Sequence, residues 1–141
     1  MKQQTFLTTV LLTAFSILPV HAQTSTASTY SPGPWQPIAR VVPNRDMLVQ
    51  FVNHTDVVLE YASTTNEAPP RRLPPTATAM LGEFDTPAYF VINSVDVSVP
   101  LYYEISRTPD NVIVVRIRKA GSNTPLHSSF NVNSMGAIYA Y

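Results

Sequence analysis

Two histidines and one carboxylate are the side chains of this chain best suited to hold a metal ion. His54 and Asp56 flank Thr55 in a predicted turn, and His127 lies far downstream. Zinc sites need three or four such ligands to converge, and nothing in the spacing requires His127 to meet the other two. An exposed polar turn is the better explanation of His54 and Asp56. We therefore predict no metal site and no other cofactor.

Acids and hydroxyls supply the other candidates for catalysis. Glu83 and Asp85 fall on one side of an extended segment, as an acid/base couple or a calcium site would require. They also adjoin Gly82 and Pro87 at a predicted strand end, where solvated acids are ordinary. No serine lies in a Gly-x-Ser-x-Gly elbow, and a Ser-His-Asp triad would depend on histidines from predicted loops. We predict no catalytic residue, which favours a protein that is not an enzyme.

Three residues are the candidates for ligand binding. Trp35 is the only tryptophan, and our interpretation is that its ring caps the core, since large aromatics are usually partly buried. The alternative is that the ring presents an aromatic face to a sugar or a peptide. Arg71 and Arg72 could bind a carboxylate or phosphate, although an arginine pair in an exposed loop is usually just solvated.

Composition excludes several classes of function. The chain has no cysteine, which rules out disulfides, thiolate zinc sites, iron–sulfur clusters, blue copper and cysteine nucleophiles. Without residues 1–22, eight basic and nine acidic side chains remain, a net charge of about −1. Nucleic-acid-binding domains usually carry a basic face, so we expect no nucleic-acid partner. Asn53-His54-Thr55 is a glycosylation sequon for a host that has the machinery.

The first 22 residues have the pattern of a secretory signal peptide. Lys2 precedes an apolar run from Phe6 to Val20, and Ala22 ends a small-residue cleavage motif before Gln23. We predict cleavage after Ala22 and an exported protein, periplasmic or secreted, with no integral membrane segment left. The alternative is an uncleaved N-terminal anchor.

The remainder divides into a tail and one domain. Residues 23–34 are rich in Thr, Ser, Ala and Pro and have little to bury, so we predict a flexible tail. Residues 35–141 form short apolar runs of period two with prolines between them, which indicates strands. The predicted strands are Ile38–Val42, Met47–Asn53, Val57–Ser63, Thr76–Phe84, Ala88–Asn93, Leu101–Arg107, Val112–Lys119, Ser128–Val132 and Ala137–Tyr141. The proline-rich segment Thr64 to Pro75 is predicted to be an extended, exposed loop.

One hairpin can be predicted with its register. Between the runs Leu101–Arg107 and Val112–Lys119, Pro109 pre-sets φ for a turn and Asn111 tolerates positive φ. A three-residue loop keeps the apolar positions of both strands on one face, whereas a two-residue loop would place Tyr103 against Arg116. We therefore predict the cross-strand pairs Ile105 with Val115, Tyr103 with Ile117, and Glu104 with Arg116.

These observations predict an all-β, antiparallel sandwich of seven to nine short strands. The layout resembles small exported immunoglobulin-like sandwiches. The resemblance covers residues 35–141 and rests on strand spacing, because the Cys-Trp-Cys core of antibody domains is missing. It implies a fold and no function.

We expect a non-enzymatic binding or scaffolding component of the periplasm, the cell envelope or the extracellular space. Its partner would be an envelope or extracellular protein or a polysaccharide, because exposed loops on a sandwich are common binding platforms. Two alternatives stay open. One is a hydrolase of an envelope polymer, which needs a histidine, a carboxylate and a hydroxyl in one cleft. The other is a carbohydrate-binding module that uses Trp35.

Overall fold

The structure, a computed structural model, describes residues 35–64, 69–82, 84–95 and 98–141. The chain divides into two units, Met1–Tyr30 and Ser31–Tyr141, and the description below concerns the second. The signal peptide 1–22 and the tail 23–34 lie outside the described residues, so both stay predictions. No helix among the described residues has the length and hydropathy needed to cross a membrane.

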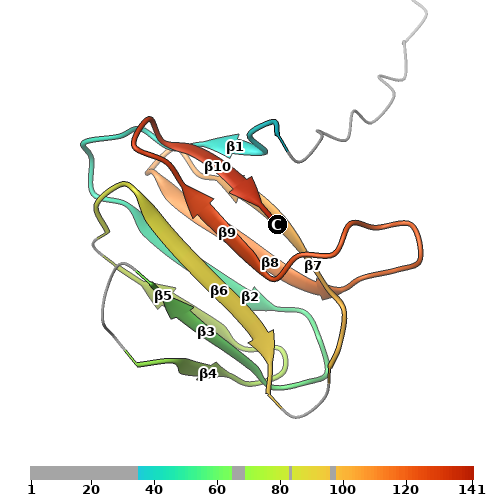
Figure 1. Cartoon of the computed structure of the whole chain (residues 1–141). Helices are drawn as coiled ribbons and strands as arrows, with labels where there is room; N and C mark the ends of the chain where they lie inside the picture. Colours follow the sequence, from blue (N-terminus) through green and yellow to red (C-terminus); the bar gives the residue numbers. More distant parts are fainter. Residues whose placement is uncertain (1–34, 65–68, 83, 96–97) are drawn as a thin grey trace, which may run out of the picture. The chain divides into compact units, whose positions relative to one another are not determined.

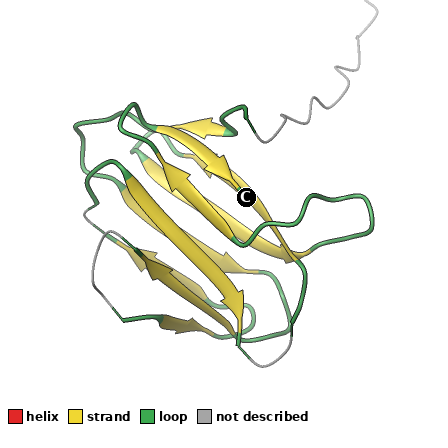
Figure 2. Ribbon diagram, in the orientation of Figure 1, coloured by secondary structure: helices red, strands yellow, loops and turns green. Residues whose placement is uncertain are grey.

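Ten strands and no helix make up the described part of the chain, which confirms the all-β prediction (Figure 2). The strands are β1 (Ala39–Arg40), β2 (Leu48–Asn53), β3 (Leu59–Ser63), β4 (Arg71–Leu73), β5 (Thr78–Leu81), β6 (Ala88–Ser94), β7 (Leu101–Arg107), β8 (Val112–Lys119), β9 (Ser129–Val132) and β10 (Ala137–Ala140). One sheet has six strands in the order β1-β10-β9-β6-β3-β4, and the other has four in the order β5-β2-β8-β7. All neighbouring strands are antiparallel except β2 and β8, which are parallel.

The two sheets form two layers of a β-sandwich around an aromatic core (Figure 1). Phe51 on β2 of the four-stranded sheet reaches across to the other layer. Its ring centroid lies 4.6 Å from that of Tyr61, 6.1 Å from Phe90 and 6.3 Å from Phe130. These rings point into the space between the sheets because alternate residues of a strand point to opposite faces. β2 alternates half-buried and buried residues along its whole length, so the predicted sandwich is confirmed. Its described part has ten strands where the sequence predicted seven to nine, with β4 as the additional strand, and its β2–β8 pair is parallel where antiparallel neighbours were predicted.

The β7–β8 hairpin has the predicted register. Asn111 has φ 64°, and its N–H donates to the carbonyl of Thr108 at 3.1 Å, which closes the three-residue loop. The observed pairs include Ile105 with Val115, Tyr103 with Ile117, and Glu104 with Arg116. Local turn chemistry and alternation were therefore sufficient to set this register.

The charged side chains of the hairpin pair differently from the expectation. The Glu104 carboxylate lies diagonally against Arg118, with Nε to Oε2 3.4 Å apart. Arg116, directly opposite Glu104, instead donates from its guanidinium to the hydroxyl of Ser106 at 3.3 Å. Long side chains reach diagonal neighbours on a sheet, so the backbone register does not decide which arginine meets the carboxylate.

Asn111 also has a role that its turn position did not reveal. Its buried Oδ1 accepts the N–H of Val42 at 2.8 Å, and Nδ2 donates to the carbonyls of Val42 at 3.1 Å and Asp46 at 3.3 Å. These bonds tie the hairpin turn to the connection between β1 and β2. Glycine would also adopt the positive φ, but it would leave these backbone groups without their hydrogen-bond partner. Asparagine is therefore needed here for its side-chain amide as well as for its conformation.

The sequence predicted that the whole segment from Thr64 to Pro75 is an exposed loop. Part of it is a strand instead. Arg71–Leu73 forms β4, which pairs with β3 so that Leu73 lies opposite Leu59. Leu73 is buried in the core. The edge of a strand has backbone N–H and C=O groups without partners. Burial of Leu73 holds residues 71–73 beside β3, where their backbone pairs with these groups.

Candidate functional site

A pocket of about 470 Å³ opens between the end of β6, the start of β7 and the residues just before β9. Its floor and walls include apolar side chains from both sheets. Its polar lining consists of uncharged groups: Asn93, Ser94, Ser98, His127 and Ser128. No carboxylate, lysine or arginine lines it among the described residues.

His127 is held firmly at this pocket. Its Nδ1 accepts the backbone N–H of Tyr103 at 2.9 Å, and the backbone N–H of His127 donates to the carbonyl of Leu101 at 2.8 Å. Its ring stacks on Tyr102, with centroids 5.3 Å apart, and lies tilted against Tyr103 at 5.4 Å. Tyr102 also lies directly opposite Arg118 on β8, and no local pattern in the sequence indicates its stack on the histidine.

The hydrogen bond from Tyr103 determines the chemistry of the imidazole. Because Nδ1 accepts, the neutral ring carries its proton on Nε2, which is then a donor. A general base of the triad type needs the opposite tautomer, with a proton on Nδ1 held by a carboxylate. Burial also lowers the pKa of His127 below its ordinary value. The group is thus suited to donate a hydrogen bond and poorly suited to remove a proton.

The environment of His127 predicts a pH dependence of stability. The unfolded chain takes up a proton on this residue near the ordinary pKa of about 6.5, whereas the folded chain takes it up only at lower pH. The free energy of unfolding should therefore fall as the pH drops below about 6.5. Its slope against pH should correspond to the uptake of at most about one proton on unfolding. Urea denaturation between about pH 5 and pH 8 measures this slope.

The variant His127→Gln should lose this contribution. The matched control is His54→Gln, which removes an exposed imidazole and leaves the His127 contribution in place. Equal slopes for His127→Gln and the unaltered protein would show that His127 titrates alike in the folded and unfolded chains.

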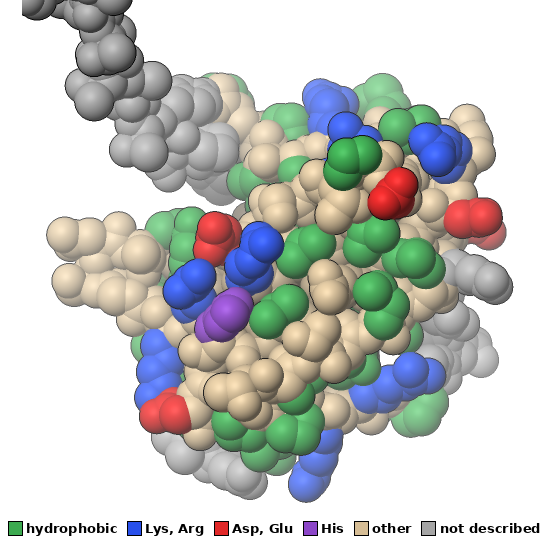
Figure 3. All heavy atoms as spheres, turned by 180° about the vertical axis from the view of Figure 1, so that it is seen from behind, with side chains coloured by type: hydrophobic (Ala, Val, Ile, Leu, Met, Phe, Trp, Pro, Cys, Tyr) green, Lys and Arg blue, Asp and Glu red, His purple; other side chains and the backbone are tan. Residues whose placement is uncertain are grey.

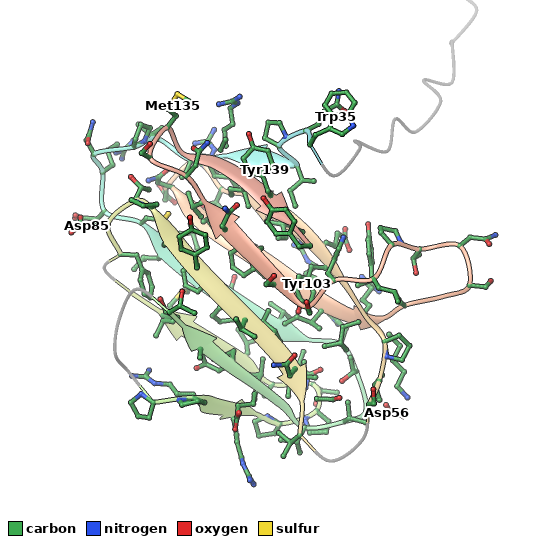
Figure 4. The ribbon with its side chains drawn as sticks, viewed as in Figure 1. Trp35, Asp56, Asp85, Tyr103, Met135 and Tyr139 are labelled. Carbon is green, nitrogen blue, oxygen red and sulfur yellow. The ribbon has the colours of Figure 1, made fainter. Side chains whose placement is uncertain are left out.

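Beside the pocket, the outer face of the six-stranded sheet carries a row of aromatic and amide side chains. Tyr139 on β10 pairs with Asn131 on β9, which pairs in turn with Tyr89 on β6. Tyr141 continues β10, because its N–H donates to the carbonyl of Ser129 at 2.9 Å. Tyr89 is 48% and Tyr141 52% exposed. The face is the one turned toward the viewer in Figure 1, and Figure 4 labels Tyr139 on it.

A tight turn between β9 and β10 places Tyr139 in this row. Gly136 has φ 75°, and a Cβ there would collide with the carbonyl oxygen of Val41. Asn133 supports the turn, since its Oδ1 accepts the N–H groups of Met135 at 3.0 Å and Ala137 at 2.9 Å. Only glycine fits both the conformation and the space.

Trp35 does not cap the core, so that interpretation is wrong. The side chain is 74% exposed, and Figure 4 shows it standing off the domain beside β1. Val41 and Ile138 are buried where β1 meets β10, which leaves the core at this edge filled without the indole. A role of Trp35 in binding stays a prediction.

The two candidate arginines do not converge. Arg71 pairs with Tyr61 and Arg72 with Glu60 on neighbouring β3. Both side chains are exposed, but successive residues of a strand point to opposite faces. The two guanidinium groups therefore cannot grip one anion together, and anion binding by either one stays a prediction.

His54 and Asp56 lie apart from the His127 pocket. They line a separate pocket of about 400 Å³ with Lys119. The carboxylate of Asp56 is bonded to the Lys119 ammonium, 2.5 Å away, and this bond lowers the pKa of Asp56. No cluster of three or more potential metal-ligating side chains occurs among the described residues. Of the other acid pair, Glu83 and Asp85, only Asp85 lies in the described residues, where it is exposed. The pairing of the two acids stays a prediction.

The glycosylation sequon is not available on the folded domain. Asn53 is 0% exposed, and its Nδ2, the atom that would carry a glycan, donates to the carbonyls of Val57 at 2.9 Å, Leu73 at 3.1 Å and Pro74 at 2.9 Å. Thr55, the third residue of the motif, donates its hydroxyl to Asn53 Oδ1 at 2.7 Å. The motif is a structural network that joins β2 to β3 and β4.

Comparisons with family models, with curated proteins and with solved structures gave no match to this chain. Its function is therefore argued from the site alone.

Proposed function

We propose that this protein is a small exported, non-enzymatic binding protein of the periplasm, the cell envelope or the extracellular space. Its ligand contacts the His127 pocket and the adjoining outer face of the six-stranded sheet. The observation that carries the proposal is the lining of the pocket, where hydroxyl, amide and imidazole groups surround an apolar floor. Pockets of this kind orient a ligand through a few polar groups while apolar walls supply the contact area.

The same geometry weighs against the alternative of an envelope-polymer hydrolase. At the His127 pocket, the neutral imidazole presents a donor at Nε2 and no described carboxylate faces it. At the other pocket, the hydroxyl of Thr55 is bonded to Asn53 and the carboxylate of Asp56 to Lys119. Among the described residues, neither histidine has both a free hydroxyl and an orienting acid beside it, which is the arrangement that nucleophilic catalysis requires.

Export and the immunoglobulin-like relationship are parts of this proposal. Export is supported by the signal pattern of residues 1–22. The immunoglobulin-like relationship is supported by two antiparallel-rich sheets over one core. The partner is an envelope or extracellular molecule and not a nucleic acid, in keeping with the nearly balanced charge.

A capture experiment on the native envelope fraction tests the proposal. Protein recovered from outside the cytoplasm should begin at Gln23 by intact mass, and the immobilised protein should retain a component of the solubilised envelope. Ser128→Trp, which fills the pocket, should weaken this capture by at least about tenfold. The control Ser122→Trp places the same side chain in the same loop, where residue 122 is exposed and outside the pocket lining, and should leave capture unchanged.

Two results would contradict the proposal. Capture that resists Ser128→Trp would remove the pocket from the binding site. Time-dependent release of soluble fragments from the envelope polymer, lost in His127→Ala, would show that the protein is a hydrolase.

A further inference from the structure

We propose that the outer face of the six-stranded sheet binds an uncharged glycan, with Tyr89 and Tyr139 stacking on its sugar rings on either side of Asn131. The inference rests on the proposed binding function and names the ligand class. The carbohydrate contact then lies on the sheet itself and not at Trp35, which the sequence offered only as an alternative site.

The first support is the spacing of the rings. Tyr139, Asn131 and Tyr89 lie in one row across β10, β9 and β6, so the two tyrosines are separated by two strand spacings, about 9.6 Å. That separation is close to the length of a disaccharide. Tyrosine rings cover the apolar face of a pyranose, while their hydroxyls and neighbouring amides bond its hydroxyl groups. The sheet thus holds two platforms at a separation that one glycan chain can span.

The second support is an unsatisfied polar atom between the rings. Oδ1 of Asn131 is buried and has no hydrogen-bond partner among the described residues. A buried acceptor without a donor costs free energy. Because this oxygen is covered in the unbound protein, a sugar hydroxyl would supply the missing donor when the Asn131 amide turns outward on binding. The row then contains both the stacking surfaces and a polar group that ligand binding satisfies.

The third support is the absence of charge at the centre of this face. Strands β6, β9 and β10 contain no Asp, Glu, Lys or Arg. In the described strands of this sheet, the outward-facing charged residues are Arg40 on β1, Glu60 on β3 and Arg72 on β4, on either side of β10, β9 and β6. An anionic polymer would find no counter-charge at the tyrosine row, whereas an uncharged glycan needs none.

The opposite side of the molecule differs from this face. Figure 3, which views the molecule from behind, shows hydrophobic side chains with Lys, Arg, Asp and Glu around them. Met80 on β5 is an exposed apolar residue of the four-stranded sheet. An apolar centre with a charged rim is the anatomy of protein interfaces. The tyrosine row itself presents hydroxyls and the Asn131 amide, which favours sugar over protein.

The tyrosine row also leads into the His127 pocket. Asn93, which faces outward on β6 like Tyr89, lines that pocket together with Ser128, the residue just before β9. A glycan lying across the sheet can therefore extend one of its residues or a branch into the pocket, where the imidazole of His127 and the hydroxyls of Ser98 and Ser128 offer hydrogen bonds.

Affinity electrophoresis of the purified protein tests the inference. The probes are hydroxyethyl cellulose, galactomannan, soluble starch and the neutral polysaccharide of the native envelope, with polygalacturonate as the acidic comparison. We expect retardation by a neutral polymer and none by polygalacturonate. Tyr89→Ala and Tyr139→Ala should each weaken binding by about tenfold or more, because a stacking ring is lost.

Matched variants separate binding from folding. Tyr89→Phe and Tyr139→Phe keep the ring and should retain most of the affinity, and Met80→Ala on the opposite sheet should retain all of it. Neutral-glycan binding that survives both alanine variants would overturn the inference and leave the proposed function standing. Capture of an envelope protein that Tyr89→Ala abolishes, with no neutral polysaccharide bound, would show a protein-docking face instead. Failure of both the polysaccharide and the capture assays would overturn the inference and the proposed function together.

Discussion

Replacing Asn53 by aspartate should lower the free energy of unfolding by about 3–5 kcal/mol. The side chain is fully buried, and its Nδ2 donates to the carbonyls of Val57, Leu73 and Pro74. Aspartate has almost the same shape, but at neutral pH it would set a carboxylate against three carbonyl oxygens. A buried charge without a partner is among the most destabilising changes that one substitution can make. Denaturant unfolding at neutral pH measures the loss.

A surface substitution of the same chemistry is the control. Asn123→Asp lies in an exposed loop and should change the free energy of unfolding by less than about 0.5 kcal/mol. Lowering the pH should recover part of the Asn53→Asp loss, because a protonated carboxyl can donate one hydrogen bond. If the two aspartate variants were equally stable, the network around Asn53 would not be as described.

Truncating Ile117 to alanine should cost about 2–5 kcal/mol of stability. Ile117 is 0% exposed on β8, opposite Tyr103 on β7 and opposite Asn53 on the parallel strand β2. β8 lies between β2 and β7 in its sheet, so the surrounding backbone is held on both sides. Because the neighbouring strands hold this backbone in place, it cannot move into the cavity that the truncated side chain leaves, and the cavity adds to the cost. A urea series on the purified protein gives the cost.

The matched comparison on the same hairpin is Glu104→Ala. Glu104 and Arg118 are each about half exposed, and an ion pair in that setting contributes less than about 1 kcal/mol. A greater loss for Glu104→Ala than for Ile117→Ala would mean that the inward and outward faces of β7 and β8 are exchanged.

Features that depend on neighbouring residues could be predicted from the sequence. Pro109 and Asn111 defined the loop, and the alternation on both sides of it left one register that buries Tyr103 and Ile117 together. The outward direction of Tyr89 also follows from period two, because it lies between Ala88 and Phe90, which are both buried. Burial of one face is enough to specify these positions, since a slip by one residue would expose every apolar side chain.

Features that depend on distant residues could not be predicted. The amide of Asn111 holds Val42 and Asp46, which lie 69 and 65 positions away in the chain, and no local pattern announces such a partner. Arg71–Leu73 forms a strand because its backbone pairs with the free edge of β3. Trp35 stays outside because the core beside β1 is already filled, a condition that depends on the packing of the whole domain.

The sequence by itself determined the all-β class, most of the strands and the register of the β7–β8 hairpin, because these follow from turn chemistry and alternation over a few residues. Only the tertiary structure decided that β10, β9 and β6 are neighbours, that β2 runs parallel to β8, and that His127 faces Tyr103. The physical reason is that strand order depends on which surfaces bury best together across the chain. The tyrosine row and the His127 pocket exist only once that order is set.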